Sequence, residues 1–115
     1  MNTDNVVEFP QADPDLAEEA RIAAAIVAGI RDGSGTAESD LVERYSRGLR
    51  FLLIRRVGDA ERASDLLQET LCIAIEKLRE IDLDNPERLA GYLRGIAVRV
   101  AMNANRKRQR EPASM

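Results

Sequence analysis

Apolar residues recur every three or four positions along most of the chain, which is the period of an amphipathic α-helix. The first such stretch follows Asp13-Pro14, a capping residue before a proline at the first helical position, and we expect it to run to about Ile30. Residues 32–35 (DGSG) should end it. Its expected apolar face consists of Leu16, Ala20, Ala23, Ile26, Val27 and Ile30.

Two further helical stretches follow on either side of Gly58. The second helix is expected to start at a cap provided by Thr36 or Ser39, and Gly58 should close it. Asp59 should then cap the third helix. The second apolar stripe is Leu41, Val42, Tyr45, Leu49, Leu52, Leu53 and Val57; the third is Ala63, Leu66, Leu67, Leu71, Ala74, Ile75 and Leu78.

A fourth helix is expected after a loop at residues 80–87, starting at Asn85-Pro86 and reaching about Arg108. Pro112 should mark the end of the ordered part. No convincing strand pattern or repeat appears, so the sequence predicts an all-α fold, a compact bundle of about four helices. The apolar positions of the fourth helix are Leu89, Tyr92, Leu93, Ile96, Ala97, Val100, Ala101 and Ala104.

Composition narrows the chemistry. Of the 115 residues, 44 % are apolar and 32 % charged, as in a globular domain, and no apolar run has the length of a membrane span. The chain has no His and a single Cys, Cys72, so zinc sites of the usual kinds and an internal disulfide cannot form. We therefore expect a cytoplasmic protein without metal, cofactor or enzymatic activity, although an active site of carboxylates alone stays open.

Charge is distributed unevenly along the chain. The net charge is −3, yet residues 1–20 carry six acids and no base, whereas residues 94–110 carry six bases and no acid. At about 100° per residue, Arg88, Arg99 and Arg106 fall on one line of the fourth helix, with Tyr92 and Arg110 close by. Such a stripe can bind phosphates, and Tyr92 could stack on an unpaired base. The alternative is a solvated helix face with Tyr92 in the core.

The third helix presents the opposite charge in its first two turns, which carry Glu61, Asp65, Gln68 and Glu69. These residues could form a docking edge for a basic partner, and Asp65, Gln68 and Glu69 share one face. The alternative is that acids near a helix start only complement the macrodipole. Cys72 lies within the apolar pattern, and we expect it to be a small core or boundary residue and not a nucleophile.

Two segments resemble the bacterial sigma-70 family, specifically its extracytoplasmic-function (group IV) type. Residues 58–70 (GDAERASDLLQET) resemble the "GD…AEDLVQEVF" signature of region 2.2. Residues 92–107 (YLRGIAVRVAMNANRK) resemble "WLYRIARNLALDALRR" of regions 2.3–2.4, and residues 22–45 are similar to the start of region 2. Together the similar segments cover about residues 16–110 in the family's order.

This resemblance implies a domain that docks on the clamp helices of the RNA polymerase β′ subunit, captures the non-template strand of the promoter −10 element and helps to open the duplex. The docking residues would be Asp65, Gln68 and Glu69. The DNA face would include the loop at residues 81–91, which accepts a flipped base in the family, and the fourth helix. There the DNA-binding residues would be Arg88, Tyr92, Arg94, Arg99, Asn103 and Arg106.

The sequence departs from the family pattern at several places. Ser64 stands where an acid is usual, Tyr92 replaces Trp, and Arg99 and Asn103 replace a common Asn and Asp. Family members also carry a second domain that reads the −35 element. Here we expect a flexible lead-in at residues 1–13, a region 2 domain at 14–110, and a tail or linker start at 111–115.

An anti-sigma factor is a further partner that the resemblance suggests. The competing hypothesis is a sigma-like helical protein-interaction module or regulator without a DNA role.

Overall fold

A computed structural model of the chain describes residues 14–81 and 83–110, with side chains from residue 16 onward. It consists of helices and a short 3-10 turn, and the described part contains no strand, which confirms the all-α prediction. The elements are α1 (Pro14–Arg31), α2 (Gly35–Val57), α3 (Ala60–Glu80), η2 (Pro86–Arg88) and α4 (Leu89–Arg110). The expected cap at Asp13, the lead-in at 1–13, and the tail at 111–115 with Pro112 lie outside the described residues.

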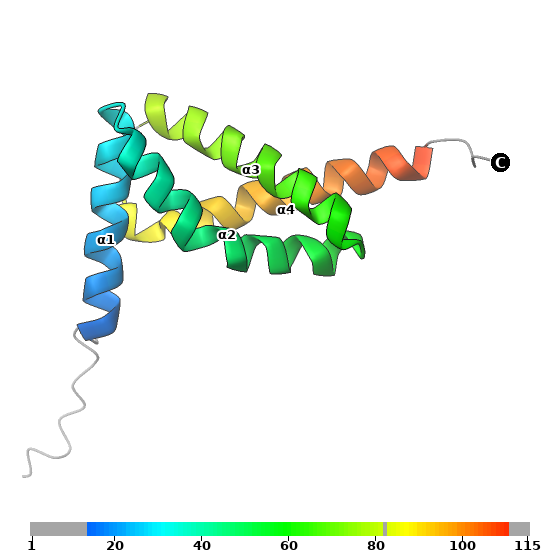
Figure 1. The fold of residues 1–115 in the computed structure, drawn as a ribbon, viewed down its shortest axis with the longest axis horizontal. Coiled ribbons are helices and arrows are strands. Elements are labelled where there is room, and N and C mark those ends of the chain that lie inside the picture. The colour runs from blue at the N-terminus through cyan, green and yellow to red at the C-terminus, as the bar shows by residue number, and fades with distance from the viewer. Residues whose placement is uncertain (1–13, 82, 111–115) are drawn as a thin grey trace, which may run out of the picture.

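The helices α2, α3 and α4 pack on one another along their lengths, and α1 crosses one end of this group. α2, α3 and α4 are in mutual contact, while α1 contacts α2, α3 and η2. In Figure 1, α2 and α4 run in the same general direction with α3 antiparallel to them, and α1 stands across the end of α4 and oblique to the first half of α2. The last turns of α4 extend beyond the neighbouring helices. The fold therefore holds three long helices side by side and leaves their outer faces available.

The turn between α1 and α2 depends on one left-handed glycine. Gly33 has φ of 81°, and the following Ser34 N–H donates to the Gly29 carbonyl at 2.9 Å. The Ser34 hydroxyl then accepts a hydrogen bond from the Ala37 N–H at 3.2 Å, so Ser34 caps α2. The prediction of a cap at Thr36 or Ser39 was wrong, because α2 already begins at Gly35 and both residues lie inside it.

The turn between α2 and α3 follows the expected pattern. Gly58 has φ of 75°, and its N–H donates to the Ile54 carbonyl at 2.8 Å. An Asp59 carboxylate oxygen accepts from the Glu61 N–H at 2.9 Å and thereby caps α3. Both predictions are confirmed, and the short connection holds α2 and α3 antiparallel.

The connection into α4 differs from the expectation. Asn85 and Pro86 begin the 3-10 turn η2, in which the Arg88 N–H donates to the Asn85 carbonyl at 2.8 Å. The Asn85 side chain makes no capping hydrogen bond, and α4 begins only at Leu89. Pro86 fits because the first turn of a helix leaves its N–H groups without intrahelical acceptors. The predicted start at Asn85-Pro86 was therefore four residues early for an α-helix.

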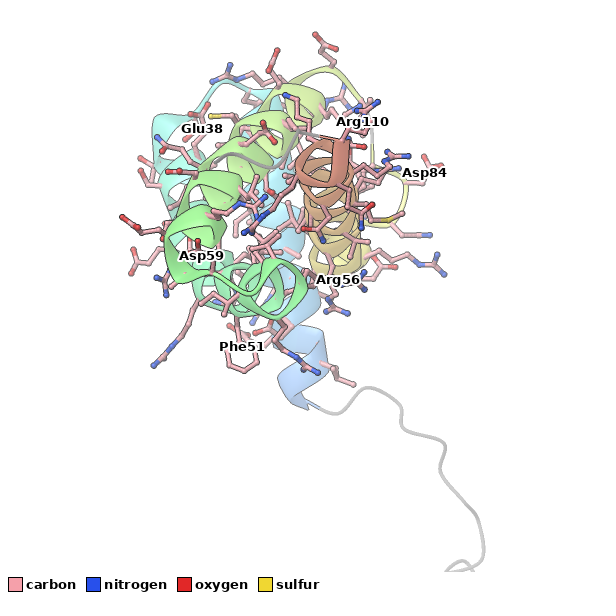
Figure 2. All side chains as sticks on the ribbon, turned by 90° about the vertical axis from the view of Figure 1, so that its right-hand side faces the viewer. Glu38, Phe51, Arg56, Asp59, Asp84 and Arg110 are labelled. Atoms are coloured by element: carbon pink, nitrogen blue, oxygen red, sulfur yellow. The ribbon has the colours of Figure 1, made fainter. Side chains whose placement is uncertain are left out.

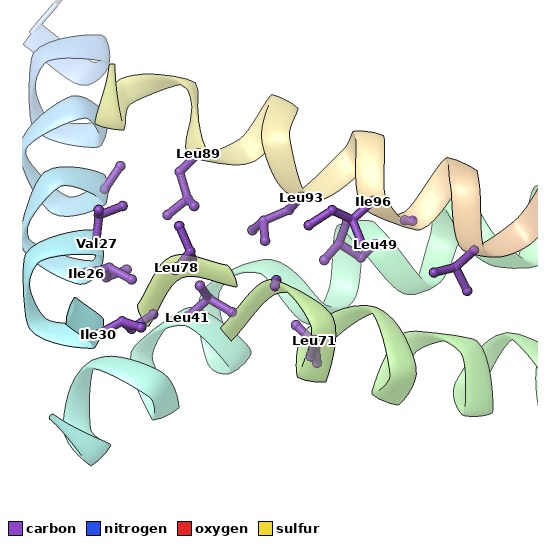
Figure 3. Close-up of a cluster of buried hydrophobic side chains, with 14 of the residues drawn as sticks. Ile26, Val27, Ile30, Leu41, Leu49, Leu71, Leu78, Leu89, Leu93 and Ile96 are labelled. Atoms are coloured by element: carbon purple, nitrogen blue, oxygen red, sulfur yellow. The ribbon is translucent and has the colours of Figure 1, made fainter. Parts of the chain in front are cut away.

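A single apolar core joins the helices, and Figure 3 shows part of it. α4 contributes a continuous stripe that packs against leucines of α2 and α3, while Ile26, Val27 and Ile30 in the second half of α1 close one end of the core. Each fully buried Leu or Ile contributes about 1.5–3 kcal/mol through transfer from water. The largest fully buried side chains are Ile30, Leu41, Leu53, Leu78, Leu89, Leu93 and Thr70.

Two predicted core residues are in fact exposed. Leu16 is 63 % exposed, because it lies in the first turns of α1, at the end that projects away from the other helices (Figure 1). Val42 is 38 % exposed. The core positions of α2 follow a four-residue spacing through Leu41, Leu49 and Leu53, and Val42 lies about 100° around the helix from Leu41.

A close contact between α1 and α2 at Gly29 predicts a stability difference between two glycine substitutions. A Cβ on Gly29 would stand 2.5 Å from the Ala37 Cβ, whereas a Cβ on Gly95 would meet nothing within 4 Å. We expect Gly29→Ala to destabilise the fold, since over-packing costs about 1–3 kcal/mol against a helix-propensity gain of about 1 kcal/mol. Gly95→Ala is the matched control and should stabilise by up to about 1 kcal/mol. Urea unfolding followed by circular dichroism measures both, and equal stability of the two variants would contradict the close contact.

Candidate nucleic-acid interface and the acidic face of α3

The outer face of α4 carries two of the predicted arginines. Arg99 and Arg106 are both exposed and lie two helical turns apart on the same side. Met102 lies between them and is 49 % exposed. Gly91 and Gly95 lie nearby in the sequence, and a Cβ at either would meet nothing within 4 Å. This face therefore combines cationic groups with open surface that a strand could approach.

Tyr92 combines features of both interpretations offered by the sequence. It is half-buried and packs against the core, and this burial raises the pKa of its hydroxyl above 10.0. The nearby positive charge of Arg99 acts in the opposite direction and lowers the same pKa. The ring is therefore held by the core, with Arg99 close to it. A half-exposed ring beside an arginine is a suitable surface for stacking an unpaired base.

Of the other predicted DNA-binding residues, Arg88 lies before α4 and Arg94 lies on another side of it. Arg88 is exposed in the 3-10 turn η2, directly before Leu89. Arg94 is exposed on the side of α4 that faces α2, where it lines a groove of about 270 Å3 together with Arg44 and Gly48. The arginines of α4 thus serve two adjoining surfaces.

Asn103 and Arg106 occur together at the border between α4 and α3. The Arg106 guanidinium donates a hydrogen bond to the Asn103 side-chain oxygen, and both are exposed. They line a cleft of about 630 Å3 whose opposite wall includes Leu66 and Glu69 of α3. Residues that the sequence analysis assigned to separate DNA and protein surfaces therefore meet at this cleft.

The acidic face of α3 is exposed as predicted. Asp65, Gln68 and Glu69 point away from the core. Cys72 is exposed on the same face, so the expectation of a core or boundary position was wrong. Although Leu71 beside it is buried, each residue turns the helix by about 100°, which places Cys72 one turn after Gln68 and Glu69.

Comparison with known families decides the identity of this fold. The family model for sigma-70 region 2 matches residues 41–111, which is more than half of the chain. The chain belongs to the sigma-70 family, as a region 2 domain. No curated protein and no solved structure shows a significant match to it.

Membership gives the two faces a biological setting. A sigma region 2 domain acts with core RNA polymerase in promoter recognition, so its partners are the polymerase and promoter DNA. The matched residues include all of α3, η2 and α4 and most of α2. Both candidate faces of this sigma domain lie inside the matched part.

Ser64, which replaces a usual acid, has a structural partner. Its hydroxyl accepts a hydrogen bond from the Arg50 Nε at 3.1 Å, and so links α3 to α2. The donor is a cationic guanidinium, but both side chains are exposed, so water competes for this hydrogen bond. Ser64 is therefore joined to α2, while Glu61, Asp65 and Glu69 are exposed acids in the first turns of α3.

The sequence analysis missed a second basic surface on α2. Residues 44–58 contain five arginines and no acid, which is a readable signal, and Phe51 among them is 64 % exposed. The apolar periodicity of α2 identifies only its buried face, so the exposed arginines and Phe51 were not predicted as a surface. Figure 2 shows Phe51 pointing into solvent, with Arg56 toward the α4 side of the same helix.

Within residues 14–81 and 83–110, no group of three or more acidic or cysteine side chains could hold a metal ion. Among the same residues, no helix is long and apolar enough to cross a membrane.

The proximity of Arg99 to Tyr92 predicts a change in a tyrosine titration. The chain has two tyrosines and no tryptophan, so a Tyr45→Phe background leaves Tyr92 as the only phenol. We expect this phenol to titrate above pH 10.0, and Arg99→Ala to raise its pKa further because the cation favours the phenolate. Ultraviolet absorbance against pH measures both midpoints, with Lys77→Ala on α3 as the control that should leave the midpoint unchanged. An unchanged midpoint in Arg99→Ala would place that arginine elsewhere.

Because the pKa of Tyr92 is raised in the folded protein, the free energy of unfolding should fall at high pH. Because the folded protein holds the Tyr92 phenol in its neutral form, this contribution to stability is complete below pH 10.0 and is lost as pH rises through the folded-state pKa. Circular dichroism should therefore be recorded at each pH of the Tyr92 titration, so that ionisation of the phenol is distinguished from unfolding.

Proposed function

We propose that this sigma domain docks on the clamp helices of the polymerase β′ subunit through α3 and receives the non-template strand of the −10 element on α4. The observation that supports this most directly is the separation of charge. The exposed acids Asp65 and Glu69 lie on α3, whereas Arg99 and Arg106 lie on the outer face of α4. In Figure 2, α3 and α4 lie beside each other, so their outer faces look in different directions. One domain can then contact both partners together.

The proposed mechanism needs only binding energy. Flipping a base out of the duplex costs a few kcal/mol. Stacking on an aromatic ring such as Tyr92 returns about 1–3 kcal/mol for each captured base. Contacts from Arg99 and Arg106 to phosphates add an attraction that weakens as salt rises. Capture of the open strand would thus shift the duplex toward melting, without a covalent step or a cofactor.

Several finer assignments follow from the same proposal. The segments at residues 58–70 and 92–107 support assignment to the extracytoplasmic-function type. A sigma factor of this type would act in the cytoplasm and would be regulated by an anti-sigma factor. The domain would have no enzymatic activity of its own. The loop that ends at η2, with Arg88, would receive a flipped base, and Arg94 and Asn103 would contact the strand at the two edges of α4.

The competing proposal is a sigma-like regulator that binds protein and not DNA. The half-buried state of Tyr92 and the Arg106–Asn103 hydrogen bond are compatible with it, because both describe an ordinary helix surface. The two proposals differ in what happens to single-stranded DNA, which the regulator should not bind through α4.

The docking half of the proposal predicts the behaviour of a charge-reversal variant. Asp65→Arg plus Glu69→Arg should abolish co-purification with core polymerase, because like charges would then face a basic partner. Both side chains are exposed, so helicity should stay unchanged. Asp40→Arg plus Glu43→Arg on α2 introduces the same charge away from α3 and should bind like the parent. Retained binding by the α3 variant would refute the docking site.

Cys72 offers an independent test of the same face. A bulky maleimide on this single exposed thiol should block docking sterically, and bound polymerase should protect the thiol from labelling. The unmodified Cys72→Ala variant should dock normally, since no role in charge recognition is assigned to the thiol.

The DNA half predicts two different defects on α4. Arg106→Ala should weaken binding of a −10-like single strand for all sequences alike, and should flatten the salt slope of log K by about 0.7. Tyr92→Ala should cost about 1–3 kcal/mol with little change in that slope, whereas Tyr92→Phe retains the ring and should bind like the parent. Fluorescence anisotropy at several salt concentrations measures both effects, and thermal melting checks that Tyr92→Ala still folds.

Lys77→Ala on α3 is the control for lost positive charge and should leave the slope unchanged. If both α4 variants fold and bind single-stranded DNA like the parent, the regulator without a DNA role becomes the better account.

A further inference from the structure

We propose that α2 carries a second binding surface for single-stranded DNA, which continues the path of the strand from α4. This α2 strip consists of Arg44, Gly48, Phe51, Arg55 and Arg56. The inference rests on the proposed function, because it takes the strand to arrive from the outer face of α4.

The α2 strip is hollowed along its length. A groove of about 420 Å3 is lined by Gly48, Phe51, Leu52, Arg55 and Arg56. The groove of about 270 Å3 next to it is lined by Arg44, Gly48 and Leu52 of α2 and by Arg94 of α4. The two grooves share Gly48 and Leu52, and the absence of a side chain at Gly48 keeps the floor low where they meet.

The charge of the strip is largely uncompensated. No acid occurs between Arg44 and Gly58 in the sequence. Arg44 pairs with Glu19 of α1, but within the described part of the chain no carboxylate lies in ion-pair contact with Arg55, Arg56 or Arg94. Exposed cations without partners favour a polyanion, and phosphates of a nucleic acid are the polyanion already present beside this domain.

Phe51 gives the strip a second feature of strand-binding surfaces. Its side chain is 64 % exposed and projects from the bundle (Figure 2), and Arg47 and Arg55 flank it at one helical turn on either side. A single exposed apolar residue is common on protein surfaces. A solvent-facing aromatic ring between arginines and next to a groove is the combination that stacks bases while it neutralises phosphates.

The strip is continuous with α4 in space. α2 and α4 run side by side in the same direction, and the Asn105 side-chain amide donates to the Arg56 carbonyl at 3.1 Å. Arg94 joins the two helices at the other end of the groove. Residues 44–56 of a helix span about 18 Å. At about 3.4 Å per nucleotide in a stacked strand, this length accommodates about five nucleotides.

The test compares oligothymidylates of two lengths, dT6 and dT16, by fluorescence anisotropy with the full chain. Phe51→Ala should weaken binding of dT16 about 5- to 150-fold, as expected for loss of one stacked base, and should change dT6 binding less than threefold. Arg55→Ala plus Arg56→Ala should flatten the salt slope for dT16 by about 1.4, at about 0.7 for each lost phosphate contact.

Matched controls lie on other helices. Leu16→Ala removes an equally exposed apolar side chain from α1. Lys77→Ala plus Arg79→Ala removes the same charge from the far end of α3. Both should bind dT16 like the parent. All the substituted side chains are exposed, and melting curves confirm that each variant folds.

The outcomes separate the α2 strip from the α4 site. If Arg106→Ala weakens dT16 binding while the α2 variants bind like the parent, the strip is refuted and the α4 site stands. If the α2 variants weaken dT16 binding while Arg106→Ala and Tyr92→Ala have no effect, the strip stands and the α4 site fails. If the α2 variants leave DNA binding unchanged but lose core polymerase, the occupant is protein and the proposal is overturned.

Discussion

The burial of one face of α4 is the interaction on which the rest of this structure depends. Leu89, Leu93 and Ile96 begin a stripe that continues through Val100, and α2 and α3 each pack against part of it. Because a helix of this length buries only one side, the opposite side stays free for its arginines. The same residues that hold the bundle together therefore fix the direction in which Arg99 and Arg106 face.

This arrangement also distributes charge among the helices. α3 runs antiparallel to α2 and α4, and it presents its acids away from the core, whereas α2 and α4 run together and present arginines. Within the described residues, the acids Asp65 and Glu69 of α3 thus lie on a different helix from the arginines Arg99 and Arg106 of α4. The cleft between α3 and α4, where Glu69 faces Arg106, is the boundary between the acidic and basic surfaces.

Much of the fold was predictable from the sequence because helix periodicity and glycine turns are local signals. Gly58 and Asp59 were assigned correctly, and so was the buried stripe of α4. The errors have a common physical cause, which is that periodicity does not say how far a neighbouring helix reaches. Leu16 lies beyond the end of the packed region, and Val42 lies at its edge. The 3-10 turn at η2 was also missed, and it packs against α1, which is a tertiary contact that helix periodicity does not report.

The candidate site was less predictable than the fold. The spacing rule placed Arg99 and Arg106 on one face of α4, and both are exposed there, whereas Arg88 lies in the 3-10 turn before that helix. Cys72 was misplaced because its sequence neighbours are apolar, although its angular position puts it with Gln68 and Glu69. The basic surface around Phe51 could have been found from the run of arginines without acids, but its continuity with α4 required the three-dimensional structure.

We propose that this sigma domain binds polymerase and DNA at the same time, on adjoining faces of one bundle. The most direct measurement is the titration of core polymerase into a complex of this domain with a labelled −10-like single strand, followed by analytical ultracentrifugation. The account predicts a ternary species that sediments with the polymerase and retains the labelled strand, and that fails to form with Asp65→Arg plus Glu69→Arg. Release of the strand as polymerase binds would show that the two partners compete for one surface, and would contradict the account.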